Sequence, residues 1–131
     1  MNFVLDSYSI ISFLENEPGA DRVADLIRKG KNRESSLYLS IVNWGEVYYI
    51  IYRSAGKSSA VKALRTLESL PIEIVSIDLP LTLEAAELKA EKKMSYADCF
   101  AAALALQKMA ALVTGDKEFK QVQNKIKILW L

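Results

Sequence analysis

Four acidic residues, far apart along the chain, each occupy a position from which an α/β protein could bring them together. Asp6 directly follows an apolar run, and Asp116 lies just beyond another. Glu46 lies about one turn into a predicted helix, and Asp98 lies in the first turn of a later one. In open α/β sheets, ligands bind beyond the carboxyl ends of the strands. Chain direction places Asp6 and Asp116 at that edge, but it does not decide the positions of Glu46 and Asp98.

A cluster of these carboxylates would suit divalent metal ions. Carboxylates a few ångström apart repel each other by several kcal/mol even at an effective dielectric constant of about 20, so a fold that gathers them needs a cation. Oxygen ligands without histidine or thiolate favour Mg²⁺ or Mn²⁺. Such ions lower the pKa of water and offset the charge that builds up on a phosphodiester during cleavage. The pattern therefore indicates metal-assisted phosphodiester hydrolysis.

The absence of histidine and the single cysteine exclude several other types of active site. The chain has no histidine and a single cysteine, Cys99. Catalytic triads that use histidine, paired-histidine cleavage of RNA and the usual histidine-ligated zinc sites are therefore excluded. One cysteine also excludes a disulfide framework, and a lone thiol is expected in a reducing cytoplasm.

Each acid also has a purely structural alternative. Asp6 could cap the first helix, and Asp116 could be a turn or cap residue. Glu46 could be a solvated helix residue. Asp98 could form a capping box with the serine three residues before it. However, Asp98 opens a helix whose next eight residues, Cys99–Leu106, carry no charge, and a charge that enters a buried helix is seldom without a role.

The elements that must position these residues alternate between strand and helix patterns. Strands are predicted at 2–5, 36–40, 72–76, 111–114 and 126–130. Helical spacing predicts helices over 7–16, 42–53, 96–109 and 117–122, with others around 23–30, 61–67 and 81–88. Strands separated by helices imply parallel βαβ units, so we expect one domain, residues 1–131, with a three-layer α/β/α sandwich around a five-stranded parallel sheet.

Sequence patterning also predicts which strands are central. The runs at 2–5, 36–40 and 111–114 are continuously apolar, as strands covered on both faces should be. Glu73 and Lys127 interrupt the other two runs, so these are expected at the edges.

The bulk composition is that of an ordinary soluble domain. Hydrophobic residues make up 51% of the chain and charged residues 25%, and the formal net charge is +1. The start of the chain is not typical of a signal peptide, and the most apolar stretch is too short to span a bilayer. We therefore expect a cytoplasmic protein without a membrane contact. The small net charge means that any contact with RNA must come from local patches.

Four segments containing the acids resemble motifs of the PIN domain, and particularly of the VapC-like toxins of bacterial and archaeal toxin–antitoxin pairs. In the first segment an apolar strand leads into Asp-Ser, and in the second a serine and a glutamate are separated by five residues. In the third segment an aspartate opens an alanine-rich helix, and the fourth contains a Thr-x-Asp-x-Glu-Phe motif. These segments are Phe3–Ser7, Ser40–Val47, Ser95–Ala102 and Leu112–Phe119. The resemblance covers essentially the whole chain. It departs at Lys92–Met94, where many relatives carry glycine, which bears on the shape of that loop.

The resemblance implies a set of site residues. Asp6, Glu46, Asp98 and Asp116 would bind the metal and support catalysis, with Ser7 and Thr114 as supporting polar residues. Glu118 would either support the site or extend the acidic cluster. Three lysines that flank the acids in sequence are candidates for contact with RNA phosphates. These are Lys92, Lys93 and Lys117.

The resemblance also implies an activity and partners. We expect a Mg²⁺- or Mn²⁺-dependent endoribonuclease that cleaves RNA phosphodiesters with a metal-activated water, as the toxin of a type II toxin–antitoxin system. A small antitoxin and a second copy of the chain are the expected protein partners. The helix predicted over 42–53 is apolar almost all round, which is more than a one-sided surface helix needs, and part of it could meet such a partner.

Two other classes of function remain open from the sequence. A PIN fold that only binds RNA or a protein would need none of the acids for chemistry. A receiver or phosphatase-like phosphoryl-transfer domain is also an α/β fold. However, the phosphatase pattern needs a second aspartate at position 8, which is Tyr8, and the paired acids and lysine of a receiver are not found.

Overall fold

The centre of the molecule is one parallel sheet of five strands, in a computed structural model that describes residues 1–131. The strands are β1 (Asn2–Leu5), β2 (Ser36–Ser40), β3 (Ile72–Val75), β4 (Ala111–Thr114) and β5 (Ile128–Trp130). Their order across the sheet is β3-β2-β1-β4-β5, with every pairing parallel. The predicted parallel sheet, with the first strand central and the third and fifth at the edges, is confirmed.

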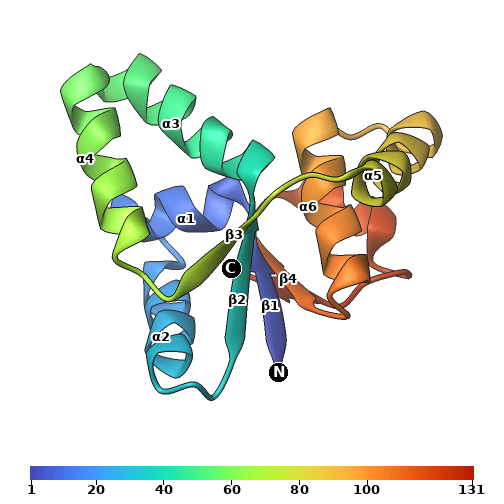
Figure 1. The fold of residues 1–131 in the computed structure, drawn as a ribbon, viewed down its shortest axis with the longest axis horizontal. Helices are drawn as coiled ribbons and strands as arrows, with labels where there is room; N and C mark the ends of the chain where they lie inside the picture. Colours follow the sequence, from blue (N-terminus) through green and yellow to red (C-terminus); the bar gives the residue numbers. More distant parts are fainter.

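Helices cover both faces of this sheet (Figure 1). One face carries α1 (Ser7–Leu14), α2 (Ala20–Lys31), α3 (Ile41–Ala55) and α4 (Lys57–Glu68). The other face carries α5 (Leu79–Glu91), α6 (Tyr96–Gln107) and the short 3₁₀ helix η1 (Lys117–Val122). The predicted α/β/α sandwich is therefore confirmed. No helix is both long and apolar enough to cross a membrane.

The central strands divide their side chains between two hydrophobic cores. In β1, Val4 packs with α5 and α6, whereas Phe3 and Leu5 pack with the helices on the opposite face. In β4, Leu112 and Val113 divide in the same way. This follows from the two-residue period of a strand. It explains why these strands read as continuous apolar runs: each face of the sheet is covered.

Helix α6 is deeply buried although it belongs to an outer layer of the α/β/α sandwich. Its alanines Ala101, Ala102 and Ala103 are completely buried, and small side chains let the helix lie close to the sheet and to its neighbours. Ser95 caps the helix by accepting a hydrogen bond from the backbone N–H of Asp98. The acid in its first turn is consequently drawn into the protein, with only 9% of its surface exposed.

Some element boundaries differ from the predicted ones. Helix α1 ends at Leu14 and not at residue 16, because Asn16 has a left-handed backbone with φ of 51°. Strand β5 begins at Ile128 and not at residue 126, because the N–H of Ile126 bonds to the carbonyl of Val122 in a turn. Helices α2 to α5 are longer than their predicted ranges. Apolar spacing marks only the buried residues of a helix, so exposed residues at its ends were not included.

The strand core can be tested with one substitution and a matched control. We expect Leu112→Ala to lower the free energy of unfolding by about 2–5 kcal/mol, because Leu112 has no exposed surface and its removal leaves a cavity. The control Leu83→Ala removes a leucine that is 62% exposed and should change stability by less than about 0.5 kcal/mol. Urea unfolding followed by circular dichroism measures both. Equal losses in the free energy of unfolding for the two variants would contradict the burial of Leu112 in the core.

Candidate functional site

The four predicted acids come together beyond the carboxyl ends of the strands. Glu46 of α3, Asp98 of α6 and Asp116 after β4 line one cavity of about 550 Å³. Asp6 lies beside them, 1% exposed and linked to Asp116 through the hydroxyl of Thr114. The structure thus brings together all four residues that were predicted from the sequence.

Asp6 caps a helix and also belongs to the acidic cluster. Its Oδ1 accepts a hydrogen bond from the Ser9 N–H at 2.8 Å, which satisfies the start of α1, and its Oδ2 accepts one from the Thr114 hydroxyl. Burial raises the pKa of Asp6 from its ordinary 3.8 to about 6, although these hydrogen bonds oppose the rise; repulsion from Asp116 adds to it. The capping alternative and the site prediction are therefore both compatible with the observed position.

Glu46 is held by uncharged hydrogen-bond donors. Its Oε1 accepts from the Ser7 hydroxyl at 3.0 Å and from the Asn43 side-chain amide at 2.9 Å. Asn43 has no exposed surface, and it also donates to the Ala97 carbonyl and accepts from the Ser40 hydroxyl at 2.7 Å. The start of α1, the first turn of α3 and the start of α6 are therefore joined around one carboxylate.

Asn43 is the site residue that sequence reasoning missed. It lies one turn before Glu46 in a helix of otherwise mostly apolar residues. A fully buried amide needs partners for each of its polar groups. An asparagine at this spacing from a candidate ligand is the signal that would have identified it.

Asp98 has the least favourable electrostatic environment of the group. Burial, together with repulsion from Asp116, Asp6 and Glu46, raises the pKa of Asp98 from 3.8 to about 7, against one hydrogen bond at Ser95. A neutral carboxylic acid or a bound cation would relieve this repulsion.

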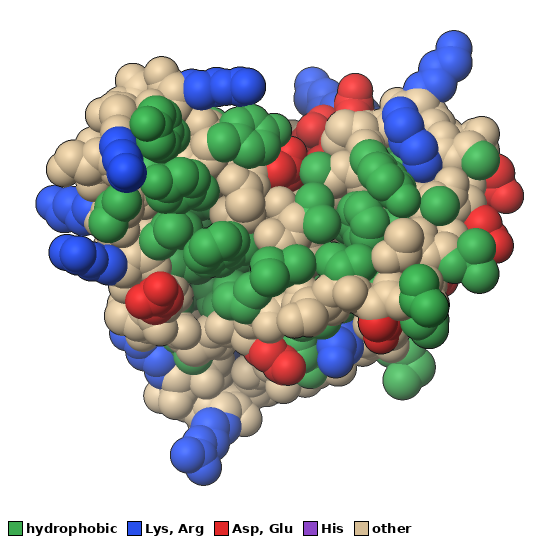
Figure 2. Space-filling view, turned by 45° about the horizontal axis from the view of Figure 1, so that its top comes forward, with side chains coloured by type: hydrophobic (Ala, Val, Ile, Leu, Met, Phe, Trp, Pro, Cys, Tyr) green, Lys and Arg blue, Asp and Glu red, His purple; other side chains and the backbone are tan.

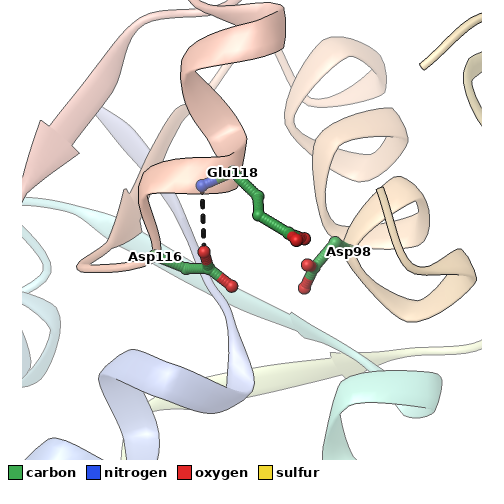
Figure 3. A group of neighbouring side chains, drawn as sticks. All are labelled: Asp98, Asp116 and Glu118. Carbon is green, nitrogen blue, oxygen red and sulfur yellow. Dashed lines mark hydrogen bonds between the residues drawn. The ribbon is translucent and has the colours of Figure 1, made fainter. Parts of the chain in front are cut away.

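The Glu118 carboxylate lies beside those of Asp98 and Asp116. Figure 3 shows the side chains of Glu118 and Asp98 directed toward one another, with Asp116 beside them. One carboxylate oxygen from each of these three residues lies within 4.8 Å of the others. The Glu118 N–H also donates to Asp116 Oδ1 at 2.9 Å, which fixes the turn that carries both acids.

The donor set of the cavity fits a hard divalent cation. Five acidic side chains line the cavity, and no lysine or arginine does; the acids are Glu17, Glu46, Asp98, Asp116 and Glu118. With no cationic side chain, a cation from solution is the available means of offsetting the charge. Carboxylate oxygens without nitrogen or sulfur ligands suit Mg²⁺ or Mn²⁺.

The three candidate lysines lie outside this cavity. Lys93 and Lys117 are exposed and Lys92 is partly exposed. The Lys93 backbone is fixed by Gln121, which accepts from its N–H at 3.0 Å and donates to its carbonyl at 3.1 Å. Met94 is buried in the α5–α6 loop, so the segment that departs from the family pattern is anchored. Contact between these lysines and RNA stays a prediction.

A comparison with protein-family models matches residues 3–125 to the PIN domain. The chain belongs to the PIN-domain family. This match spans every acid described above. A comparison with curated protein sequences finds no match.

Solved structures show that this PIN domain shares its fold with VapBC toxin–antitoxin components. A chain of the VapBC2 complex of Rickettsia felis, bound to promoter DNA, matches with a TM-score of 0.80 and 23% identity over 100% of both chains. A chain of the DNA-bound VapBC complex of Salmonella typhimurium matches with a TM-score of 0.77 and 20% identity over 98% of this chain and 97% of that one. VapC20 of Mycobacterium tuberculosis, described as a sarcin–ricin loop cleaving toxin, gives 0.71 and 18% over 93% and 95%.

The acidic cluster should make the metal-free PIN domain less stable as pH rises. The folded state holds protons on Asp6 and Asp98 up to pH values of about 6 and 7, whereas the unfolded chain releases them near 3.8. Between these values the folded state binds more protons, so the contribution of these groups to the free energy of unfolding falls with rising pH. In EDTA we expect a fall of about 1–3 kcal/mol between pH 5 and pH 8, and added Mn²⁺ should reverse it at pH 8.

Chemical unfolding at several pH values measures this dependence. Asp98→Asn should flatten the slope and reduce the stabilisation by Mn²⁺. The control Asp21→Asn removes an exposed aspartate that, like Asp98, lies in the first turn of a helix. This variant should leave the pH slope and the stabilisation by Mn²⁺ unchanged. A wild-type slope that Asp98→Asn does not alter would show that the pKa of Asp98 is not raised as described.

Proposed function

We propose that this PIN domain is a Mg²⁺- or Mn²⁺-dependent endoribonuclease and the toxin of a type II toxin–antitoxin pair acting in the cytoplasm. The observation that carries the proposal is the cluster of carboxylates in a cavity that no cationic side chain lines. Repulsion within such a cluster is a cost to folding, and a metal-dependent activity is the physical reason for a fold to keep it.

Asp6, Glu46, Asp98 and Asp116 would hold the metal, and Glu118 would complete the set. Asp98, Asp116 and Glu118 already present oxygens within 4.8 Å of one another. Each oxygen of Asp6 accepts one hydrogen bond and keeps another lone pair, so its present bonds do not prevent ligation. When bound, the ions would supply two effects: a lower pKa for water and compensation of the negative charge on the phosphodiester.

Ser7, Asn43 and Thr114 are proposed as positioning residues. They donate hydrogen bonds to Glu46 or Asp6 and are uncharged, so they orient the carboxylates without neutralising them. An arrangement that is fixed before the substrate arrives has little reorganisation left to make during the reaction.

RNA is the proposed substrate, and its support is the family together with one structural neighbour. VapC20 of M. tuberculosis, which shares the fold, is described as a sarcin–ricin loop cleaving toxin. The exposed Lys93 and Lys117 are proposed to contact RNA phosphates outside the acidic cavity.

A small antitoxin is the proposed protein partner, and a homodimer is the proposed assembly. The matching structures include VapBC complexes, and the description of another match calls VapBC a family of toxin–antitoxin systems. The apolar surface over α1 and α3, which includes the partly exposed Phe13, Trp44 and Tyr48, is available for such contacts. Figure 2 shows hydrophobic side chains gathered on this part of the surface.

The catalytic proposal predicts loss of activity with retained binding. We expect Asp98→Asn and Glu46→Gln each to lower the rate of Mg²⁺- or Mn²⁺-dependent RNA cleavage by about 100-fold or more, because each removes a charged ligand. The matched control Asp21→Asn should cleave at the wild-type rate. Cleavage of labelled RNA on denaturing gels measures the rate, and fluorescence anisotropy measures binding.

Two outcomes would count against the proposal. Wild-type cleavage that persists in excess EDTA would exclude a metal mechanism. Wild-type RNA binding without cleavage in either metal would favour the non-catalytic binding module.

A further inference from the structure

Tyr8 lines the acidic cavity and lies very close to the backbone of Gly115. A Cβ atom at Gly115 would lie only 2.3 Å from Cε1 of Tyr8 and 2.6 Å from its Cζ. The tyrosine ring therefore rests directly on the backbone at Gly115, in a space that only glycine leaves open. The ring is nevertheless 46% exposed and lines the cavity. The contact with Gly115 holds the ring in place, while the exposed remainder of the ring is available to a partner in the cavity.

The cavity has two chemically different parts. Its lining includes four acids, here called the acidic part: Glu46, Asp98, Asp116 and Glu118. It also includes four apolar residues, here called the apolar part: Tyr8, Ile11, Pro18 and Ile50. Glu17 and three serines complete the lining. Tyr8 and Ile11 lie one helical turn apart on α1, and Ile50 lies one turn beyond Glu46 on α3. The space-filling view likewise shows acidic side chains beside hydrophobic ones in the hollow between the two groups of helices (Figure 2).

We propose that the Tyr8 ring, which lies against Gly115, stacks on an unpaired RNA base. This base would be next to the phosphodiester that is cleaved at the acidic part of the cavity. This inference rests on the proposed function and names the substrate as single-stranded RNA. An aromatic ring offers a base a large surface at a small cost in conformational entropy, and every base has a π-face that can stack on it.

The surroundings of Tyr8 favour a base over other ligands. The cavity has no lysine or arginine, so the apolar part offers nothing to bind a phosphate or another anion. A cavity of about 550 Å³ has room for more than hydrated metal ions alone. In a duplex both faces of a base are stacked, so a base that reaches Tyr8 must come from a loop, a bulge or a single strand.

The test compares variants of Tyr8 on defined RNA. A single-stranded oligonucleotide that spans a cleavage position mapped with the wild-type chain is prepared intact and with one abasic ribose at each of the nearest positions. We expect Tyr8→Ala to lower kcat/KM for the intact RNA by about 5- to 100-fold, the range expected for one base–aromatic stack. One abasic position should lower the wild-type value by a similar factor but should have little further effect on Tyr8→Ala.

Matched variants separate stacking from other roles of the residue. Tyr8→Phe keeps the ring and should retain wild-type activity, whereas Tyr8→Leu keeps an apolar contact on Gly115 without a π-face and should behave like Tyr8→Ala. Tyr52→Ala removes a tyrosine of similar exposure, 45%, that does not line the cavity and should have no effect. Thermal unfolding verifies that each variant is folded.

The outcomes distinguish this inference from the proposed function. If the wild-type chain cleaves RNA and Tyr8→Ala retains both its kcat/KM and its sensitivity to abasic sites, the stacking role is overturned and the nuclease proposal stands. If the chain binds single-stranded RNA in a Tyr8-dependent way but does not cleave it, stacking is supported and the catalytic proposal is overturned. If the chain neither binds nor cleaves RNA, both are overturned.

Discussion

Repulsion among clustered carboxylates is the interaction around which this PIN domain is organised. Three carboxylate oxygens, from Asp98, Asp116 and Glu118, lie within 4.8 Å of one another in a cavity that no cationic side chain lines. Burial is the main cause of the raised pKa values of Asp6 and Asp98, and repulsion from Asp116 adds to both rises. Packing elsewhere in the domain must provide enough free energy to hold the acids in place, and a divalent cation is the natural means of relieving the repulsion.

The scaffold holds the acids with groups that do not neutralise them. Hydroxyl and amide donors from Ser7, Asn43 and Thr114 bridge separate elements around Glu46 and Asp6. Helix α6, packed through alanines, carries Asp98 to the same place. A lysine or arginine in any of these positions would stabilise the apo protein, but it would also compete with a metal for the same oxygens. The choice of neutral donors thus links the packing of the fold to its proposed chemistry.

The cavity combines this acidic cluster with an apolar surface, and the combination is consistent with a nucleotide. Charge-rich phosphate chemistry and base stacking need different surroundings, and α1 supplies a residue to each: Ser7 holds Glu46, and Tyr8 faces the apolar part. The fold is shared with VapBC chains at 23% identity or less, so the architecture itself tolerates wide changes in sequence. The proposed stacking role would then depend on individual residues such as the Tyr8–Gly115 pair and not on the shared fold.

The sequence by itself determined which strands are central, which lie at the edges, and where two of the acids lie. Continuous apolar runs mark strands that are covered on both faces, and chain direction sends Asp6 and Asp116 beyond the ends of β1 and β4. These are local properties of consecutive residues. The tertiary structure decided that Glu46 and Asp98 face the same cavity, that Asn43 links Glu46 to the start of α6, and that the Tyr8 ring contacts Gly115. Such contacts join residues far apart in the chain, and they depend on how the helices pack and on the loops between them, which no local spacing encodes.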